Sequence, residues 1–179
     1  MIRAKGAPLR PGPCRRLPGG TCAEVDFLTT RGCHAATHSH IDQVVLDTAT
    51  WEASPAFRLE KAAMDGPVEC YARNDGTGFV IPYDYMGLPH SYEPDFLVRM
   101  RGGTTLILEI KGQARDQDDA KHEAARRWVT AVNNSRKLGQ WAFHVCRDPQ
   151  MLEKELNAAA QGCPVISQPP APEDLVLLP

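Results

Sequence analysis

The stretch that decides the fold reads YEPDFLVRM over residues 92–100 and TTLILEIKG over residues 104–112, with Arg-Gly-Gly between them. In both halves apolar side chains recur at every second position, which is the pattern of a β-strand with one buried face. The glycine pair between the halves predicts a tight turn, so we expect an antiparallel hairpin. Its core-facing side chains should be Phe96, Val98, Met100, Leu106, Leu108 and Ile110.

The opposite face of this hairpin carries Asp95, Glu109 and Lys111. Aligning the two apolar faces requires a three-residue turn, which we expect over residues 102–104. Asp95 then comes opposite Lys111, with Glu109 one pair along. The sequence therefore predicts that two carboxylates and an ammonium group meet on one polar patch.

Two carboxylates at close range repel each other unless a cation lies between them. A hard divalent ion with oxygen ligands suits such a site, and we expect Mg²⁺, with Mn²⁺ as a substitute. Such an ion polarises a phosphate oxygen and activates a water, while Lys111 can offset the developing negative charge. The patch is therefore typical of metal-assisted phosphodiester hydrolysis. The alternative is a solvated polar face in which Glu109 and Lys111 pair with neighbouring side chains.

Two short motifs, PDF at 94–96 and EIKG at 109–112, follow the order and spacing of a PD-(D/E)XK nuclease. More narrowly, the chain resembles the C-terminal endonuclease domain of type III restriction enzyme Res subunits. Further segments that match the family in order are SHIDQVVLDTATWE (39–52), GFVIPY (78–83), AARRWV (124–129), AVNN (131–134) and GQWAF (139–143). The combination is more specific than any single motif.

This resemblance implies a restriction-endonuclease-like core, an α/β fold in which a mixed central β-sheet is flanked by helices. It implies a metal held by Asp95, Glu109 and the carbonyl of Ile110, with Lys111 as the catalytic lysine. It also implies an acidic residue on the helix before the core strands, and Glu52 is the matching position. The implied activity is Mg²⁺-dependent endonuclease cleavage of DNA.

The resemblance further implies double-stranded DNA as the partner, held by basic and polar side chains near the site. The candidate DNA-contacting residues are His40, Arg99, Lys121, Arg127 and Asn133. A restriction system would add a methyltransferase or helicase subunit as a partner. A homodimer is also expected, because cutting both strands usually needs two active sites.

The chain departs from the family in one respect: it contains no GxxxxGK[ST] phosphate loop, the signature of the helicase motor that precedes the nuclease in Res subunits. We therefore expect a detached nuclease domain without a motor. A first alternative is a catalytically silent DNA-binding or assembly remnant of a restriction subunit. A second is a structural interaction protein, which would have no affinity for DNA.

Three regions are expected along the chain. Residues 1–23 are rich in Gly and Pro and should form an irregular or disordered arm, residues 24–161 the nuclease domain, and residues 162–179 a Pro-rich tail. Within the domain, strands are expected over 24–31, 68–73, 78–83 and 141–146, and helices over 48–64, 116–134 and 148–161. This order indicates a mixed α/β architecture.

Charge and cysteine content restrict the remaining possibilities. The 179 residues have a net charge of −2, yet residues 95–147 hold ten Lys and Arg against six Asp and Glu, which allows a local basic surface. The six cysteines form no CxxC pair and CHAATHSH (33–40) has no second ligand cluster, so we expect free thiols and a polar loop rather than zinc. The chain has neither an apolar run near 20 residues nor a signal-peptide core, so we expect no membrane partner and a cytoplasmic location.

Overall fold

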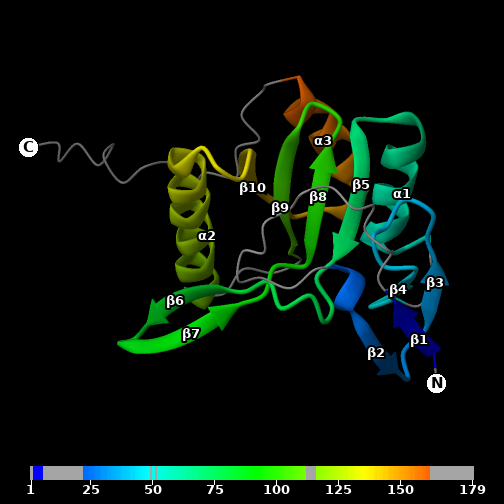
Figure 1. The fold of residues 1–179 in the computed structure, drawn as a ribbon, viewed down its shortest axis with the longest axis horizontal. Coiled ribbons are helices and arrows are strands. Elements are labelled where there is room, and N and C mark those ends of the chain that lie inside the picture. The colour runs from blue at the N-terminus through cyan, green and yellow to red at the C-terminus, as the bar shows by residue number, and fades with distance from the viewer. Residues whose placement is uncertain (1, 6–21, 49, 51, 112–115, 162–179) are drawn as a thin grey trace, which may run out of the picture.

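The structure is a computed structural model that describes residues 2–5, 22–48, 50, 52–111 and 116–161. Its centre is a four-stranded sheet with the strand order β10-β9-β8-β5 (Figure 1). The strands are β5 (Val68–Arg73), β8 (Phe96–Met100), β9 (Thr104–Ile110) and β10 (Gln140–Cys146). β10 runs parallel to β9, whereas the other neighbours are antiparallel, so the sheet is mixed.

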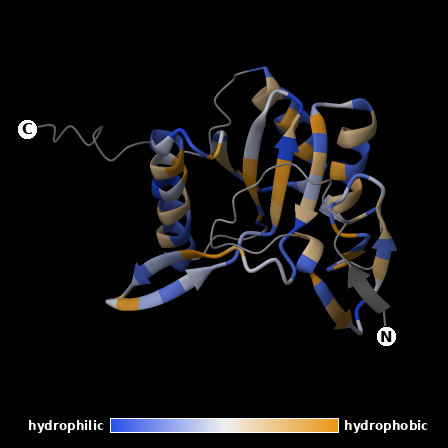
Figure 2. Ribbon diagram, in the orientation of Figure 1, coloured by the Kyte–Doolittle hydropathy of each residue, from blue (hydrophilic) through white to orange (hydrophobic). Residues whose placement is uncertain are grey.

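Helices cover both faces of this sheet. α1 (Pro55–Asp65) and α3 (Leu152–Ala160) pack on one face, where they and all four strands contribute to the larger hydrophobic core. α2 (Asp116–Ser135) packs on the other face, where Ile107 joins a second core with it. Figure 2 shows hydrophobic residues along β8, between these layers. The expected mixed sheet flanked by helices is confirmed.

Three two-stranded sheets surround the central one. They pair β1 (Ile2–Lys5) with β2 (Asp26–Thr29), β3 (Cys33–Ala35) with β4 (Gln43–Val45), and β6 (Ile81–Tyr85) with β7 (Leu88–Tyr92). Two short 3-10 helices, η1 (Cys22–Glu24) and η2 (Pro149–Met151), complete the described elements. The β6–β7 hairpin extends away from the central sheet beneath α2 (Figure 1). No helix in the described part of the chain is long and apolar enough to cross a bilayer.

The structure corrects the expected N-terminal arm at residues 2–5. These residues form β1, which gains backbone partners along β2 from Ile2 opposite Thr29 to Lys5 opposite Asp26. An available strand edge can therefore order a segment whose own sequence has little periodicity. The remaining residues of the arm up to 21, and the expected tail at 162–179, lie outside the described residues.

The first long helix begins later than expected. The expectation was a helix over 48–64 that Pro55 interrupts, but α1 starts at Pro55 itself. Ser54 is its N-cap and accepts a hydrogen bond from the backbone N–H of Ala56. Proline suits the first helical position, because the N–H it lacks would have no intrahelical partner there.

The register of the β8–β9 hairpin differs from the expected one by two residues. Phe96 pairs with Leu108 and Val98 with Leu106, so the apolar faces coincide as expected. The turn is residues 101–103 rather than 102–104, and Gly103 closes it with a φ of +87°. The expected turn would have placed Thr104 in that left-handed position, which a β-branched residue disfavours.

The corrected register changes which polar side chains meet. One pair beyond Phe96–Leu108 lies Asp95 opposite Glu109, where the expectation was Asp95 opposite Lys111. A shift of two residues returns every side chain to the same face of the sheet, so the polar patch survives the correction.

Candidate functional site

Asp95 lies just before β8 and is tied to the end of β9. Its Oδ2 accepts a hydrogen bond from the backbone N–H of Ile110 at 2.8 Å, and its carbonyl accepts one from the N–H of Asn74 at 2.9 Å. Burial raises the pKa of Asp95, although the Ile110 N–H and the charge of Arg73 partly oppose that rise. The carboxylate is thus held in one place beside the polar end of β9.

Glu109 lies on β9, on the same face as Ile107 and therefore toward α2. Its side chain is 8% exposed, and its Oε2 accepts a hydrogen bond from the Tyr92 hydroxyl at 2.8 Å. Burial, and after it the negative charge of Asp95, raises the pKa of Glu109 to about 7. The two carboxylates are therefore close enough for the charge of Asp95 to disfavour ionisation of Glu109.

Lys111 directly follows β9, and its side chain forms an ion pair with a residue of α2, the helix that covers this face of the sheet. Its Nζ lies 2.7 Å from Oδ1 of Asp118, a residue of α2 that is 2% exposed. Lys121, one turn later on α2, lies 3.6 Å from the same oxygen. Asp118 is thus shared by two ammonium groups, and it fixes Lys111 beside the carboxylate pair.

Asp118 and Tyr92 are site residues that sequence reasoning missed. Asp118 lies in the acidic run DQDD (116–119), which reads as a favourable charge at a helix start. Its spacing to Lys121 on one helical face was the available signal, but only packing of α2 on the sheet selects it over its neighbours. Tyr92 reads as the first residue of a strand, and its hydroxyl has no sequence signature.

The donor set at this point suits a hard cation. Each carboxylate has one oxygen engaged by a hydrogen bond, while the other oxygen has no hydrogen-bond donor among the described residues. The described residues contain no group of three or more His, Cys, Asp or Glu side chains that could hold a metal. Independently of that finding, the Asp95 and Glu109 carboxylates and the Ile110 carbonyl are all oxygen donors, the ligand type that Mg²⁺ prefers.

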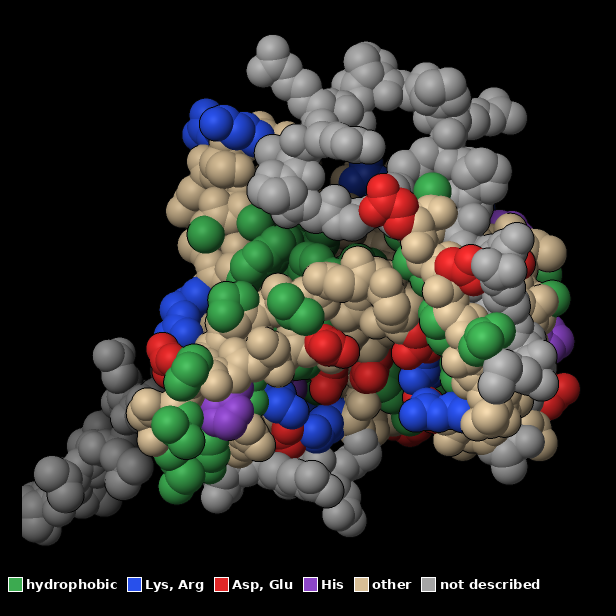
Figure 3. All heavy atoms as spheres, turned by 60° about the horizontal axis from the view of Figure 1, so that its bottom comes forward, with side chains coloured by type: hydrophobic (Ala, Val, Ile, Leu, Met, Phe, Trp, Pro, Cys, Tyr) green, Lys and Arg blue, Asp and Glu red, His purple; other side chains and the backbone are tan. Residues whose placement is uncertain are grey.

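The site lies on one face of the molecule. Figure 3 shows the molecule with the lower edge of Figure 1 turned forward, and acidic and basic side chains lie close together in the middle and lower part of this surface. Charges of both signs also continue away from the carboxylates, because Arg73 pairs with Asp47 and with Asp75. Lys111 and Lys121 add two positive charges near Glu109.

The structure does not support the expected position of the helical acid. Glu52 is exposed and lies in a turn before α1, because the helix begins only after the Ser54 cap. The buried acid of α1 is Glu60, which is 8% exposed. Its hydrogen bonds come from Thr37, His38 and Tyr71, on the face of the sheet opposite Glu109.

The five candidate DNA-contacting residues fall into separate places. Lys121 belongs to the carboxylate site, and Arg127 lies on the exposed surface of α2. Arg99 and His40 line one cavity on the central sheet. Asn133 has a structural use, because its amide accepts from the Trp141 N–H at 2.8 Å and donates to the Trp141 carbonyl at 2.9 Å.

Comparison of the chain with family models, with curated proteins and with solved structures found no match.

Proposed function

We propose that this protein is a Mg²⁺-dependent DNA endonuclease of the PD-(D/E)XK type, built on a restriction-endonuclease-like core. The observation that carries the proposal is the convergence of Asp95 and Glu109 from neighbouring strands, with Lys111 fixed beside them. This combination of groups suits hydrolysis of a phosphodiester, whose transition state gains negative charge.

Asp95, Glu109 and the Ile110 carbonyl would hold the cation. The chemistry that Mg²⁺ supplies when bound is polarisation of a phosphate oxygen and activation of a water. The protein's own groups do the rest: the Ile110 N–H orients the Asp95 carboxylate, and the Tyr92 hydroxyl orients that of Glu109. These hydrogen bonds restrict the rotation of both carboxylates, so that the second oxygen of each carboxylate is held in position to bind the cation.

Lys111 would act on the phosphate rather than on the cation. Its ammonium group can orient the attacking water and offset charge on the phosphate oxygens. Asp118 restricts this ammonium through the 2.7 Å ion pair, and Lys121 adds a second positive charge nearby. A flexible four-carbon side chain is thereby pre-positioned before the substrate arrives.

The test is cleavage of plasmid DNA with Mg²⁺ or Mn²⁺. Wild type should cut, while Asp95→Ala and Lys111→Ala should lose cleavage and keep the fold. Asp65→Ala and Lys61→Ala, exposed substitutions of matched type on α1, should cut like wild type. A folded wild type that is inert with every divalent ion would overturn the proposal. Gel-shift binding without cleavage would instead support the catalytically silent DNA-binding remnant.

The restriction context is part of the same proposal. A methyltransferase or helicase subunit would supply target recognition, and a second copy of the chain would supply the cut on the other strand. Light scattering in the presence of DNA tests the second point, with a mass of one chain per DNA as the result that would contradict it.

A further inference from the structure

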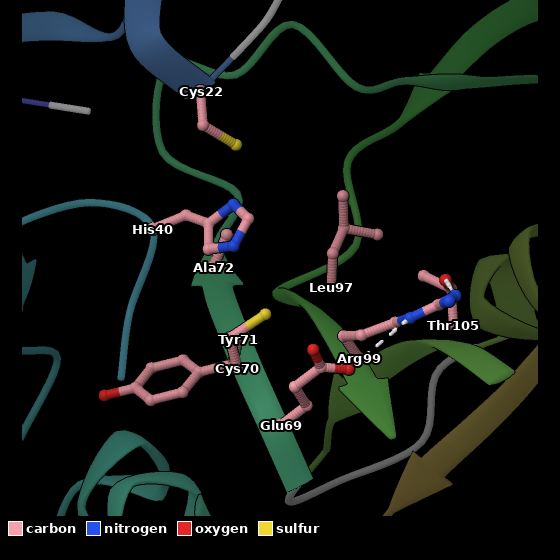
Figure 4. Close-up of a pocket in the computed structure, with 9 residues that line it drawn as sticks. All are labelled: Cys22, His40, Glu69, Cys70, Tyr71, Ala72, Leu97, Arg99 and Thr105. Atoms are coloured by element: carbon pink, nitrogen blue, oxygen red, sulfur yellow. Dashed lines mark hydrogen bonds and ion pairs between the residues drawn. The ribbon is translucent and has the colours of Figure 1, made fainter. Parts of the chain in front are cut away.

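A cavity of about 400 Å³ lies on the central sheet (Figure 4). Its floor comes from β5 and β8, where Ala72 pairs with Leu97 and Cys70 with Arg99. Leu97 pairs in turn with Ile107, so the floor lies on the face that carries Glu109. Leu97 is two residues from Asp95, which along a strand is about 7 Å. The cavity therefore adjoins the proposed cleavage site on the same surface.

The floor of this cavity is neutral and largely apolar. Ala72 and Leu97 contribute hydrocarbon, and burial raises the pKa of the Cys22 and Cys70 thiols, so both stay uncharged. A neutral thiol behaves as a small apolar group. In Figure 4 the His40 ring lies between Cys22 and the sheet, at one end of the cavity. A flat, weakly polar ligand suits these walls better than an ion.

The other end of the cavity pairs a donor with an acceptor. Arg99 Nε lies 3.9 Å from a carboxylate oxygen of Glu69, and Arg99 also donates to the Thr105 hydroxyl at 3.0 Å. Because the two charges offset each other, this rim has no net charge to attract a phosphate. Adjacent N–H donors and carboxylate acceptors do match the pairing edge of a nucleobase, which presents acceptors beside donors.

We propose that this cavity binds one unpaired nucleobase of the DNA substrate, next to the phosphate at the Asp95–Glu109 site. The inference rests on the proposed endonuclease function and adds a substrate class to it. A volume near 400 Å³ lies toward the small end of ligand sites, roughly 300–1,000 Å³, and suits one nucleoside rather than a helix. A base inside a duplex must leave the stack to enter, and an already unpaired base does so at lower cost.

The experiment measures affinity in the Lys111→Ala background with Mg²⁺, so that no probe is cut. Labelled duplexes are compared by fluorescence anisotropy: fully paired, with a one-nucleotide bulge, and with an abasic bulge. The bulged duplex should bind at least tenfold more tightly than the paired one. The abasic bulge, which has the same backbone kink without a base, should bind like the paired duplex. Equal binding of all three would overturn the proposal.

Two double variants test whether the preference for the bulged duplex arises from the cavity. Arg99→Met with Glu69→Met removes the polar rim, and both side chains are partly exposed, so the fold should persist. This pair should bring the bulged-to-paired affinity ratio close to one. Lys61→Met with Glu153→Met removes a comparable ion pair between α1 and α3 and should leave the ratio unchanged. If the rim variant keeps the bulged-to-paired affinity ratio of the parent, the proposal that the cavity binds the base is wrong. If wild type does not cleave plasmid DNA, only the proposed nuclease activity is wrong.

Discussion

Two glutamates, one on each face of the central sheet, are equally buried and behave in opposite ways. Glu60 on α1 and Glu109 on β9 are both 8% exposed. The pKa of Glu60 is lowered to about 2, whereas the pKa of Glu109 is raised to about 7. Burial is the largest influence on both and raises both, so the difference arises from their partners.

The partners of Glu60 stabilise its ionised carboxylate through hydrogen bonds. Thr37 donates through both its hydroxyl and its N–H, His38 lies 2.9 Å from Oε1, and the Tyr71 hydroxyl donates to Oε2. Within the described residues, Glu109 has a single hydroxyl donor, from Tyr92, and a second carboxylate as its neighbour. A carboxylate that costs free energy to ionise in the folded protein is poised to receive a cation, and one that is already satisfied is not.

The largest expected effect separates the two glutamates by activity. Glu109→Gln should lower Mg²⁺-dependent plasmid cleavage roughly 100-fold or more, because an amide oxygen is a weaker ligand for a hard cation. The measurement is the initial rate of plasmid nicking under saturating Mg²⁺. Circular dichroism should report an intact fold. Full activity in this variant would show that Glu109 is not part of the active site.

The next effect separates them by stability. Glu60→Gln should lower the free energy of unfolding by about 2–3 kcal/mol at pH 7, because the donor groups of Thr37, His38 and Tyr71 lose a charged acceptor. Since the pKa is lowered in the fold, this stabilisation is present above the unfolded value of 4.5 and is lost as pH falls toward about 2. Urea titrations at pH 7 and pH 3 measure it, and equal stability of variant and wild type at pH 7 would contradict the comparison.

The pH dependence at Glu109 has the opposite sign. Its pKa is raised in the fold, so its contribution is fully present below pH 4.5 and is lost as pH rises through about 7. In EDTA, wild type should therefore lose stability between pH 5 and pH 8, by at most about 3 kcal/mol. Glu109→Gln should remove most of that loss.

Added Mg²⁺ sharpens the same measurement. It should raise the melting temperature of wild type more at pH 8 than at pH 6, because binding must displace a proton at the lower pH. Glu109→Gln should show little response at either pH. A response to Mg²⁺ that is the same at both pH values would show that Glu109 is not the group that titrates.

The faces of the central hairpin could be predicted from sequence, and its register could not. Alternation assigns Phe96 and Leu108 to the core, but a pattern of period two is unchanged by a shift of two residues. The turn decides between the registers, and Gly103 in a left-handed conformation selects the one that sets Asp95 opposite Glu109. The steric preference of the turn residue therefore determines the strand register, which the hydrophobic pattern alone does not determine.

The site residues that lie on the β8–β9 hairpin could be predicted from the sequence. The residues that tertiary packing brings to the site could not. Asp95, Glu109 and Lys111 follow from spacing along two adjoining strands. Asp118 reaches Lys111 only because α2 packs against β10 and against Ile107 of β9, a contact that no local pattern encodes. Glu52 was chosen by position in a motif, whereas the buried acid of that region is Glu60.

The smallest effect uses the two tyrosines that donate to these glutamates. Tyr71 donates to Glu60 at 2.9 Å and Tyr92 to Glu109 at 2.8 Å, and each tyrosine is 2% exposed. Burial raises the pKa of both hydroxyls, so both remain donors at neutral pH. Phenylalanine at either position removes one hydrogen bond to a carboxylate and keeps the ring.

Tyr71→Phe should cost about 1–2 kcal/mol of stability and leave cleavage unchanged, because the donors of Thr37 and His38 to Glu60 remain. Tyr92→Phe removes a hydroxyl donor that stabilises ionised Glu109, so the pKa of Glu109 should rise further and the Mg²⁺ concentration for half-maximal cleavage should increase. The shift should be larger at pH 6.5 than at pH 8.5, where Glu109 is ionised in either protein. If both substitutions changed only stability, the two carboxylates would be equivalent structural groups, and the contrast between the faces of the sheet would carry no function.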